Sequence, residues 1–246
     1  MTTIEQLGGL TAQHNEIIKR VVNGALNPIS VKRALQDIIE GNVILPSFVE
    51  KVKLQIMEWE KLGVVVSHER WKSIIRQAEL FQPFTATDEP LVTGGFGYDN
   101  AKAMLERLFR AFTPPDGYTS VNYIWDAELR YVPGMEPTGE LRLVHYDPNA
   151  HVGFSPVGVR KAVAKQEGLW LAGIEVLEYL VLSPQLVTEW DGKLSPYPYL
   201  SGIELESDGN WLYVPSLSSS LDTFELSSFA AEDSHGSWAS PTVREC

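Results

Sequence analysis

The sequence predicts an α+β protein, in which a small helical N-terminal module (1–82) precedes a mixed α/β body with antiparallel hairpins (83–246). Apolar residues recur at helical spacing early in the chain, and later they alternate with polar residues as they do in strands. Charge divides the chain in a similar way. There are 10 basic and 9 acidic residues in 1–80, 5 and 9 in 81–145, and 5 and 14 in 146–246. Such a shift in composition predicts two modules.

The composition is that of an ordinary globular protein, with 246 residues, 44 % hydrophobic and 21 % charged. A net charge of −12 disfavours nucleic acid and anionic membranes as partners of the whole chain. The single cysteine, Cys246, forms no intrachain disulfide, and the N-terminus lacks the pattern of a signal peptide. The most apolar stretch, 169–182, is too short to span a bilayer. We therefore expect a cytoplasmic protein without a membrane partner.

Four short helices are expected in the N-terminal module, each opened by a residue that caps helices well. They begin after Thr3, Asn27, Ser47 and Ser67, and the last must end near Pro83. Glycines close the first three helices.

The first two helices, joined by a short link, resemble a helix-turn-helix. Lys32 and Arg33 would then lie in the first turn of a recognition helix, where base contacts are made. An αα-hairpin that packs its own core is the commoner structure, and the module lacks a basic surplus. DNA binding through this hairpin is therefore a second alternative function, and nucleic acid a disfavoured partner.

The body is expected to begin with a strand at 91–96 that runs into Gly94-Gly95-Phe96-Gly97 and a helix at about 99–112. This order can cradle phosphate on backbone N–H groups, but the full glycine fingerprint is absent and a tight turn explains the glycines equally well. Strand-like alternation follows at 118–125. The similar segments 128–132 and 140–144 predict a β-hairpin.

Two further helices are expected to begin at Ser155-Pro156 and Ser183-Pro184. Asp208-Gly209 lies between apolar runs and predicts a second hairpin. From Ser216 onward, large apolar residues recur in a serine-rich segment. We expect this segment to lie over the domain as a strap.

The densest set of potential metal ligands is His145, Asp147 and His151, where a predicted strand ends. The intervening Asp-Pro-Asn is also ordinary turn chemistry, and no complete zinc motif is present. Both explanations remain open.

Glu175 and Glu178 lie three residues apart within the apolar stretch 169–182, which belongs in the core if it is helical. Buried carboxylates need a cation, a shared proton or an arginine, and Arg130 and Arg142 are candidate partners.

If this helix packs beside His145, the two sets form one cluster. His145, Asp147, His151 and Glu178 would bind a divalent metal, and Glu175 would activate its water. The alternative function is therefore a metal-dependent hydrolase of the phosphoesterase or nuclease type.

Tyr197 and Tyr199, flanked by prolines, are candidate interface anchors, although they could equally fill a core. Together with the acidity of residues 146–246, they suit a basic protein partner. The leading functional prediction is a binding or regulatory protein that acts through protein contacts, without a cofactor.

Two blocks of sequence carry a resemblance. They are Asn23–Pro28 continuing through Val31–Gly41, and Leu141-Arg142-Leu143-Val144-His145-Tyr146-Asp147-Pro148-Asn149. Together they resemble uncharacterised proteins of uncultivated bacteria with reduced genomes. The resemblance implies a bacterial cytosolic protein and assigns no catalytic residue.

Overall fold

A computed structural model describes residues 47–246, apart from 86, 98, 137–138, 191–194 and 221. The chain divides into two compact units, Met1–Ser47 and Phe48–Cys246. The first two predicted helices, with Lys32 and Arg33, lie outside the described residues. The division does not follow the predicted boundary at residue 82, because the third and fourth predicted helices pack on strands of the second unit.

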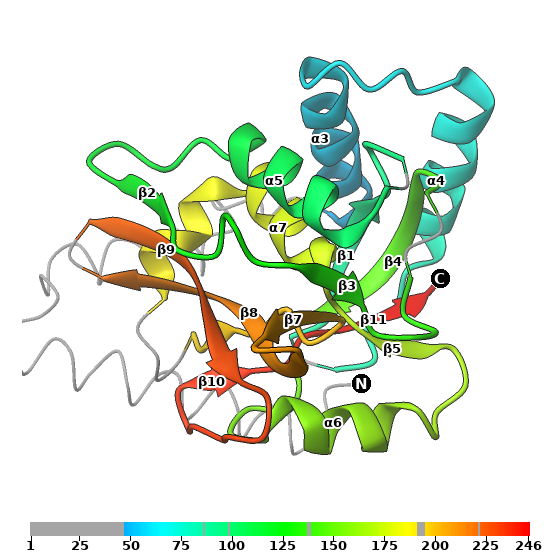
Figure 1. The fold of residues 1–246 in the computed structure, drawn as a ribbon. Helices are drawn as coiled ribbons and strands as arrows, with labels where there is room; N and C mark the ends of the chain where they lie inside the picture. Colours follow the sequence, from blue (N-terminus) through cyan, green and yellow to red (C-terminus); the bar gives the residue numbers. More distant parts are fainter. Residues whose placement is uncertain (1–46, 86, 98, 137–138, 191–194, 221) are drawn as a thin grey trace, which may run out of the picture. The chain divides into compact units, whose positions relative to one another are not determined.

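The described residues form helices together with antiparallel and mixed sheets, which confirms the α+β class (Figure 1). In chain order they are α3 (Phe48–Lys61), α4 (His68–Leu80), β1 (Glu89–Thr93), α5 (Ala101–Ala111), β2 (Thr119–Asn122), β3 (Leu129–Tyr131), β4 (Arg142–Asp147), α6 (Pro156–Val163), β5 (Leu169–Leu171), α7 (Ile174–Leu182), the 3₁₀ helix η1 (Pro184–Glu189), β6 (Tyr197–Pro198), β7 (Ile203–Ser207), β8 (Asn210–Ser220), β9 (Thr223–Ala230), β10 (Trp238–Ala239) and β11 (Thr242–Glu245). Among the residues described, no helix combines the length and apolarity needed to cross a membrane.

The strands form two main sheets and one small pair. The first sheet has the order β1-β4-β11-β5, and all its neighbours are antiparallel. The second has the order β2-β9-β8-β7-β3, with β2 parallel to β9. β10 and β6 form the parallel pair.

α7 packs in the interior, against α3, α5 and β1. Most of its apolar residues are buried, as the near-continuous apolar run predicts, while Tyr179 and Val181 are partly exposed. The run 169–182 is not one helix, however, because Leu169–Leu171 form β5 and the helix begins only at Ile174. Gly173 separates the two, and a Cβ there would lie only 3.0 Å from Cγ1 of Ile203.

α3 protects the free edge of the first sheet. The Gln55 side chain donates to the Pro90 carbonyl (2.9 Å) and accepts from the Val92 amide (2.7 Å), so it bonds the edge as a neighbouring strand would. Trp59 Nε1 donates to the Val92 carbonyl at 2.8 Å. The edge backbone of β1 is thereby satisfied and closed to pairing with another chain.

One predicted hairpin is confirmed and the other is wrong. β7 and β8 pair across Asp208-Gly209, whose φ values of 53° and 78° are those of a tight turn. The segments 128–132 and 140–144 do not pair, because β3 joins β7 and β4 joins β1 and β11. Alternation of apolar residues specifies a buried face and leaves the partner strand open.

The predicted strap from Ser216 is also wrong. This segment supplies strands of both sheets, and β11 lies between β4 and β5. Apolar side chains of β9 enter the core, where Phe224 packs on Phe109 and Phe112 at the end of α5.

Candidate functional site

The two faces of β4 carry different chemistry. In an antiparallel sheet, directly paired residues lie on the same face. His145 pairs with Arg244 and Asp147 with Thr242 of β11, so these four side chains share one face. Tyr146 lies on the opposite face and packs on Tyr179 of α7, with ring centroids 4.6 Å apart.

His145 and Asp88 form a buried pair. His145 Nδ1 lies 2.8 Å from Asp88 Oδ2, and the residues are 8 % and 6 % exposed. The same carboxylate oxygen accepts the Phe84 amide at 2.8 Å. The Phe81 ring stacks on the imidazole, with centroids 4.2 Å apart, and Phe84 packs at 4.5 Å. The ring of His145 is thus fixed by one hydrogen bond and two aromatic contacts.

A cavity of about 300 Å³, here called the His145 cavity, opens beside this pair. Its walls come from the segment before β1, the end of β4 and its following loop, the residues before β5, and β11. Arg244 also lines it, and its guanidinium lies 4.7 Å from the centre of the Phe84 ring. Within the described part of the chain, Arg244 forms no ion pair and His145 Nε2 has no hydrogen-bond partner.

Asp147 and His151 also line the His145 cavity, so three of the four predicted metal ligands share one place. The Asp147 carboxylate is already engaged, because it accepts Thr85 Oγ1 at 2.9 Å, Thr87 Oγ1 at 2.6 Å and the Asn149 amide at 3.0 Å. His151 has a positive φ of 54°, and burial lowers the pKa of its imidazole while Asp147 opposes the shift.

Glu178 does not join these residues, because α7 lies on the other face of the sheet. Its carboxyl accepts Thr93 Oγ1 and the Gly94 amide. Over the described ranges, no group of three or more His, Cys, Asp or Glu residues is placed to hold a metal ion. The condition for a single cluster is therefore not met, since a sheet separates Glu178 from His145, Asp147 and His151.

Glu175 and Glu178 are both buried, at 2 % and 0 % exposure. Burial raises the pKa of Glu178 to about 8, with a further contribution from the charge of Glu175. Burial also raises the pKa of Glu175, whose Oε2 accepts the Gly173 amide at 2.9 Å. A proton on Glu178 at neutral pH relieves the repulsion between the two carboxyls. Neither residue lines the His145 cavity, so Glu175 is not placed to act there as a base.

Neither predicted arginine forms an ion pair with these carboxyls, although the charge of Arg142 partly offsets the rise in the pKa of Glu175. Arg130 pairs with Glu204 at 2.7 Å and Arg142 with Glu245 at 2.9 Å. The glycines after β1 make two close contacts. The Gly94 amide donates to Glu178, and Gly95 lies so near Trp59 that a Cβ there would be 2.3 Å from the indole ring. Gly94 has a φ of 83° and its carbonyl accepts the Gly97 amide at 3.1 Å, which is the tight turn expected for these glycines.

The predicted interface anchors are largely inside the protein. Tyr199 is fully buried and stacks on Trp238, with centroids 4.9 Å apart. Tyr197 is half-buried, and its hydroxyl donates to the Ser219 carbonyl at 3.3 Å. The core-filling explanation thus applies to Tyr199, because β6 lies between β10 and β8.

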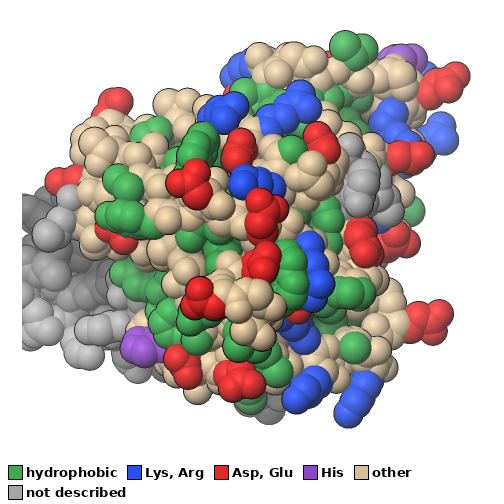
Figure 2. Space-filling model, viewed as in Figure 1, with side chains coloured by type: hydrophobic (Ala, Val, Ile, Leu, Met, Phe, Trp, Pro, Cys, Tyr) green, Lys and Arg blue, Asp and Glu red, His purple; other side chains and the backbone are tan. Residues whose placement is uncertain are grey.

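Acidic and basic side chains are interspersed over α5 and β3 on the face shown in Figure 2. Ion pairs account for part of this mixing: Arg110 with Glu106, Lys102 with Glu128, and Arg130 with Glu204. On this face the acidic surplus does not gather into a single acidic patch.

Sequence reasoning missed Asp88 and Arg244, the two charged partners of the His145 cavity. Asp88 lies just before the first strand expected in the body, and Arg244 in the segment assigned as a strap. The signal available was the pattern Thr242-Val243-Arg244-Glu245, in which a β-branched pair begins a short strand. No protein-family model, no curated protein and no solved structure matches this chain.

Proposed function

We propose that this protein binds a small anionic substrate in the His145 cavity and transfers a proton to or from it through His145. The observation that carries the proposal is the Asp88–His145 hydrogen bond beside a cavity that also contains the guanidinium of Arg244. A fixed imidazole next to a cation in a concave site is the combination that acid–base enzymes use.

The hydrogen bonds determine which nitrogen of His145 is available. An ionised carboxylate only accepts hydrogen bonds, so Asp88 Oδ2 accepts both the Phe84 amide and the Nδ1–H of His145. The proton on Nδ1 leaves a lone pair on Nε2, which can take a proton from substrate. Asp88 orients the ring and faces the positive charge that then develops on it. The imidazolium returns the proton to the product, which completes the cycle.

Arg244 supplies the recognition of the anion. Its guanidinium is held against Phe84 and presents a planar fork of donors that matches a carboxylate or a phosphate. The cavity of about 300 Å³ lies at the lower end of the roughly 300–1,000 Å³ typical of ligand pockets. A small carboxylate or phosphate ester therefore fits better than a polymer.

The competing functions have less support from the described residues. Burial of Tyr199 removes one of the two anchors proposed for a basic protein partner. The metal-dependent hydrolase loses Glu178 to the opposite face, and Nδ1 of His145 and both oxygens of Asp147 already have partners. Lys32 and Arg33, on which DNA binding depends, lie outside the described residues.

Calorimetric titration with inorganic phosphate and with acetate tests the recognition step. We expect Arg244→Gln to weaken binding about tenfold to a hundredfold, because a hydrogen bond to a charged group contributes about 1.5–3 kcal/mol. Arg107→Gln is the matched control, since Arg107 also stacks on an aromatic ring, that of Phe96 at 4.0 Å, but lies outside the cavity. Equal affinities of the two variants would contradict the proposal.

Nitrogen NMR of the imidazole tests the acid–base step. In the wild-type protein, neutral His145 should carry its proton on Nδ1 and none on Nε2. Asp88→Ala should lower the share of this tautomer, because it removes the acceptor of the Nδ1–H. The same spectrum in both proteins would show that Asp88 does not set the tautomer.

A further inference from the structure

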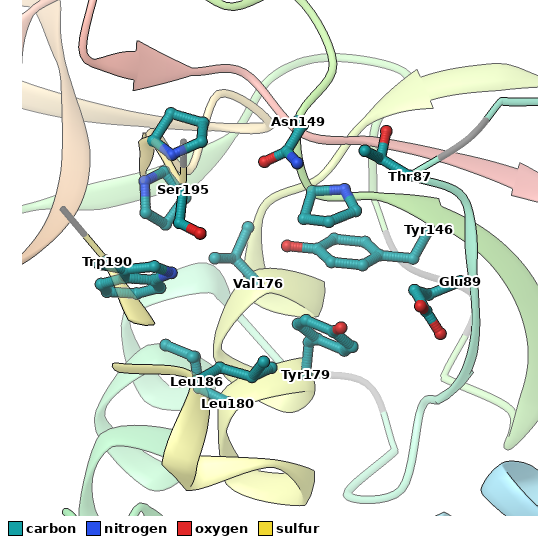
Figure 3. A pocket seen from close by; sticks show the side chains of 13 residues that line it. Thr87, Glu89, Tyr146, Asn149, Val176, Tyr179, Leu180, Leu186, Trp190 and Ser195 are labelled. Carbon is teal, nitrogen blue, oxygen red and sulfur yellow. The ribbon is translucent and has the colours of Figure 1, made fainter. Parts of the chain in front are cut away.

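A second cavity of about 270 Å³, the Tyr146 cavity, lies on the opposite face of the first sheet (Figure 3). Val176, Tyr179 and Leu180 of α7 form part of its lining, and Trp190 lies after η1. It is distinct from the His145 cavity, because β4 turns successive residues to opposite faces. The two cavities share only a wall, in which Thr85 and Thr87 bind the two oxygens of Asp147.

Three polar groups converge on this cavity. In Figure 3 the hydroxyls of Tyr146 and Ser195 and the amide of Asn149 point towards the space beside Val176. The Asn149 side-chain amide makes no hydrogen bond to any described residue, while its backbone amide is fixed by Asp147. Burial raises the pKa of Tyr146 well above its ordinary value, so its hydroxyl stays neutral and able to donate. Polar groups that converge beside apolar side chains are typical of ligand sites.

The charge of the Tyr146 cavity excludes the ligand class proposed for the His145 cavity. Within the described part of its lining there is no Lys or Arg, and Glu89 is the one charged residue. The Glu89 carboxylate is itself paired with Lys51. An anion would find no cation here, whereas aromatic and aliphatic side chains suit a neutral ring.

We propose that the Tyr146 cavity binds a neutral heteroaromatic ring of the nucleobase type. Such a ring packs on the apolar surface formed by Tyr146, Trp190 and Val176. Its edge, with a donor beside an acceptor, bonds the Asn149 amide, which offers one acceptor and two donors. Asparagine makes this two-point contact with adenine in nucleic-acid complexes. A cavity of 270 Å³ accommodates a one- or two-ring ligand and little beyond it.

Saturation-transfer NMR tests the proposal with 9-methyladenine (here adenine) as the probe and 9-methylpurine (here purine) as the comparison ligand, because the methyl group removes the ring N–H that would otherwise supply a donor beside an acceptor. We expect adenine to bind the full chain at least about tenfold more tightly than purine, which lacks the exocyclic donor, because a two-point contact discriminates by about 1–3 kcal/mol. Asn149→Ala should bring the affinity for adenine close to that for purine. Asn149→Asp, which keeps the turn but loses the amide donor, should do the same.

The His145 cavity provides the folding control. Phosphate binding to Asn149→Ala should equal that of the wild-type protein, since Asn149 does not line that cavity. If phosphate binds neither protein, the circular dichroism spectra of the two proteins serve as the folding control instead. Failure of the anion-binding proposal therefore leaves the test of the adenine proposal intact. Absence of adenine binding at millimolar concentration, equal affinities for adenine and purine, or an unchanged adenine affinity in Asn149→Ala would each overturn the proposal. Benzoate, which carries a negative charge, should not displace adenine, and displacement would likewise overturn it.

Discussion

Replacing Glu178 by glutamine should make the free energy of unfolding less dependent on pH. Glu178 has a pKa of about 8 in the folded protein, raised by burial from 4.5. In the unfolded chain the carboxyl ionises above its ordinary pKa, whereas the folded protein keeps the proton until about pH 8. The folded state is therefore favoured most at low pH, and this advantage is lost as the pH rises towards the folded pKa.

The magnitude follows from the shift. One pKa unit corresponds to about 1.4 kcal/mol, and the carboxyl is partly ionised at both ends of the range. The wild-type protein should therefore lose about 3–4 kcal/mol relative to Glu178→Gln between about pH 5 and pH 8. The amide of glutamine stays neutral throughout, can accept the Gly94 amide and can donate to the Thr93 hydroxyl. The packing around residue 178 is thus preserved.

Urea unfolding at four pH values from 5 to 8 measures this difference. Glu60→Gln, which changes an exposed carboxyl on α3, is the control and should parallel the wild-type protein. Because Glu175 is also buried, the observed midpoint belongs to the pair of carboxyls. If the wild-type and Glu178→Gln proteins keep a constant difference in unfolding free energy across this range, Glu178 does not retain its proton and our reasoning about the pair fails.

Two further predictions concern the edge of the first sheet. Gln55→Ala should lower the free energy of unfolding by about 2 kcal/mol or more, because it leaves the Pro90 carbonyl and the Val92 amide without their partner; urea unfolding measures the loss. Gly95→Ala should cost about 1–3 kcal/mol, because the added Cβ would overlap the buried ring of Trp59. Differential scanning calorimetry would report it as a lower Tm.

Each of these has a matched control. Gln77→Ala changes an exposed glutamine on α4 and should leave stability nearly unchanged. Gly236→Ala adds a Cβ where no atom lies within 4 Å. If either control lowers stability as much as its counterpart, the loss does not come from the edge of β1.

Local chemistry was predicted well from the sequence. Ser67 and Ser155 cap α4 and α6 as expected, each accepting a backbone amide three residues later. Asp208-Gly209 forms the predicted hairpin turn. In these places the residues that determine the structure are neighbours in the chain. Their pattern therefore predicts the structure without knowledge of any distant contact.

Long-range pairing could not be predicted in the same way. His145 and Asp147 were recognised as a candidate site, but their partners depend on which strands lie beside β4. Asp88 is 57 residues from His145, and Arg244 faces it only through the register of β11 on β4. Alternation indicates that 142–147 has a buried face, and it contains no information on which distant strand completes the sheet.

The position of β11 also bears on how the protein folds. Arg142 of β4 and Glu245 of β11 form an ion pair across 103 positions of sequence, so the first sheet closes only after a long loop has formed. Until β11 docks, β4 and β5 each have an unpaired edge, and the His145 cavity lacks Arg244. We expect this docking to be slow. During that interval a β11 segment from a second molecule can occupy the same gap, which would make a strand-exchanged dimer the characteristic misfolded product of concentrated refolding.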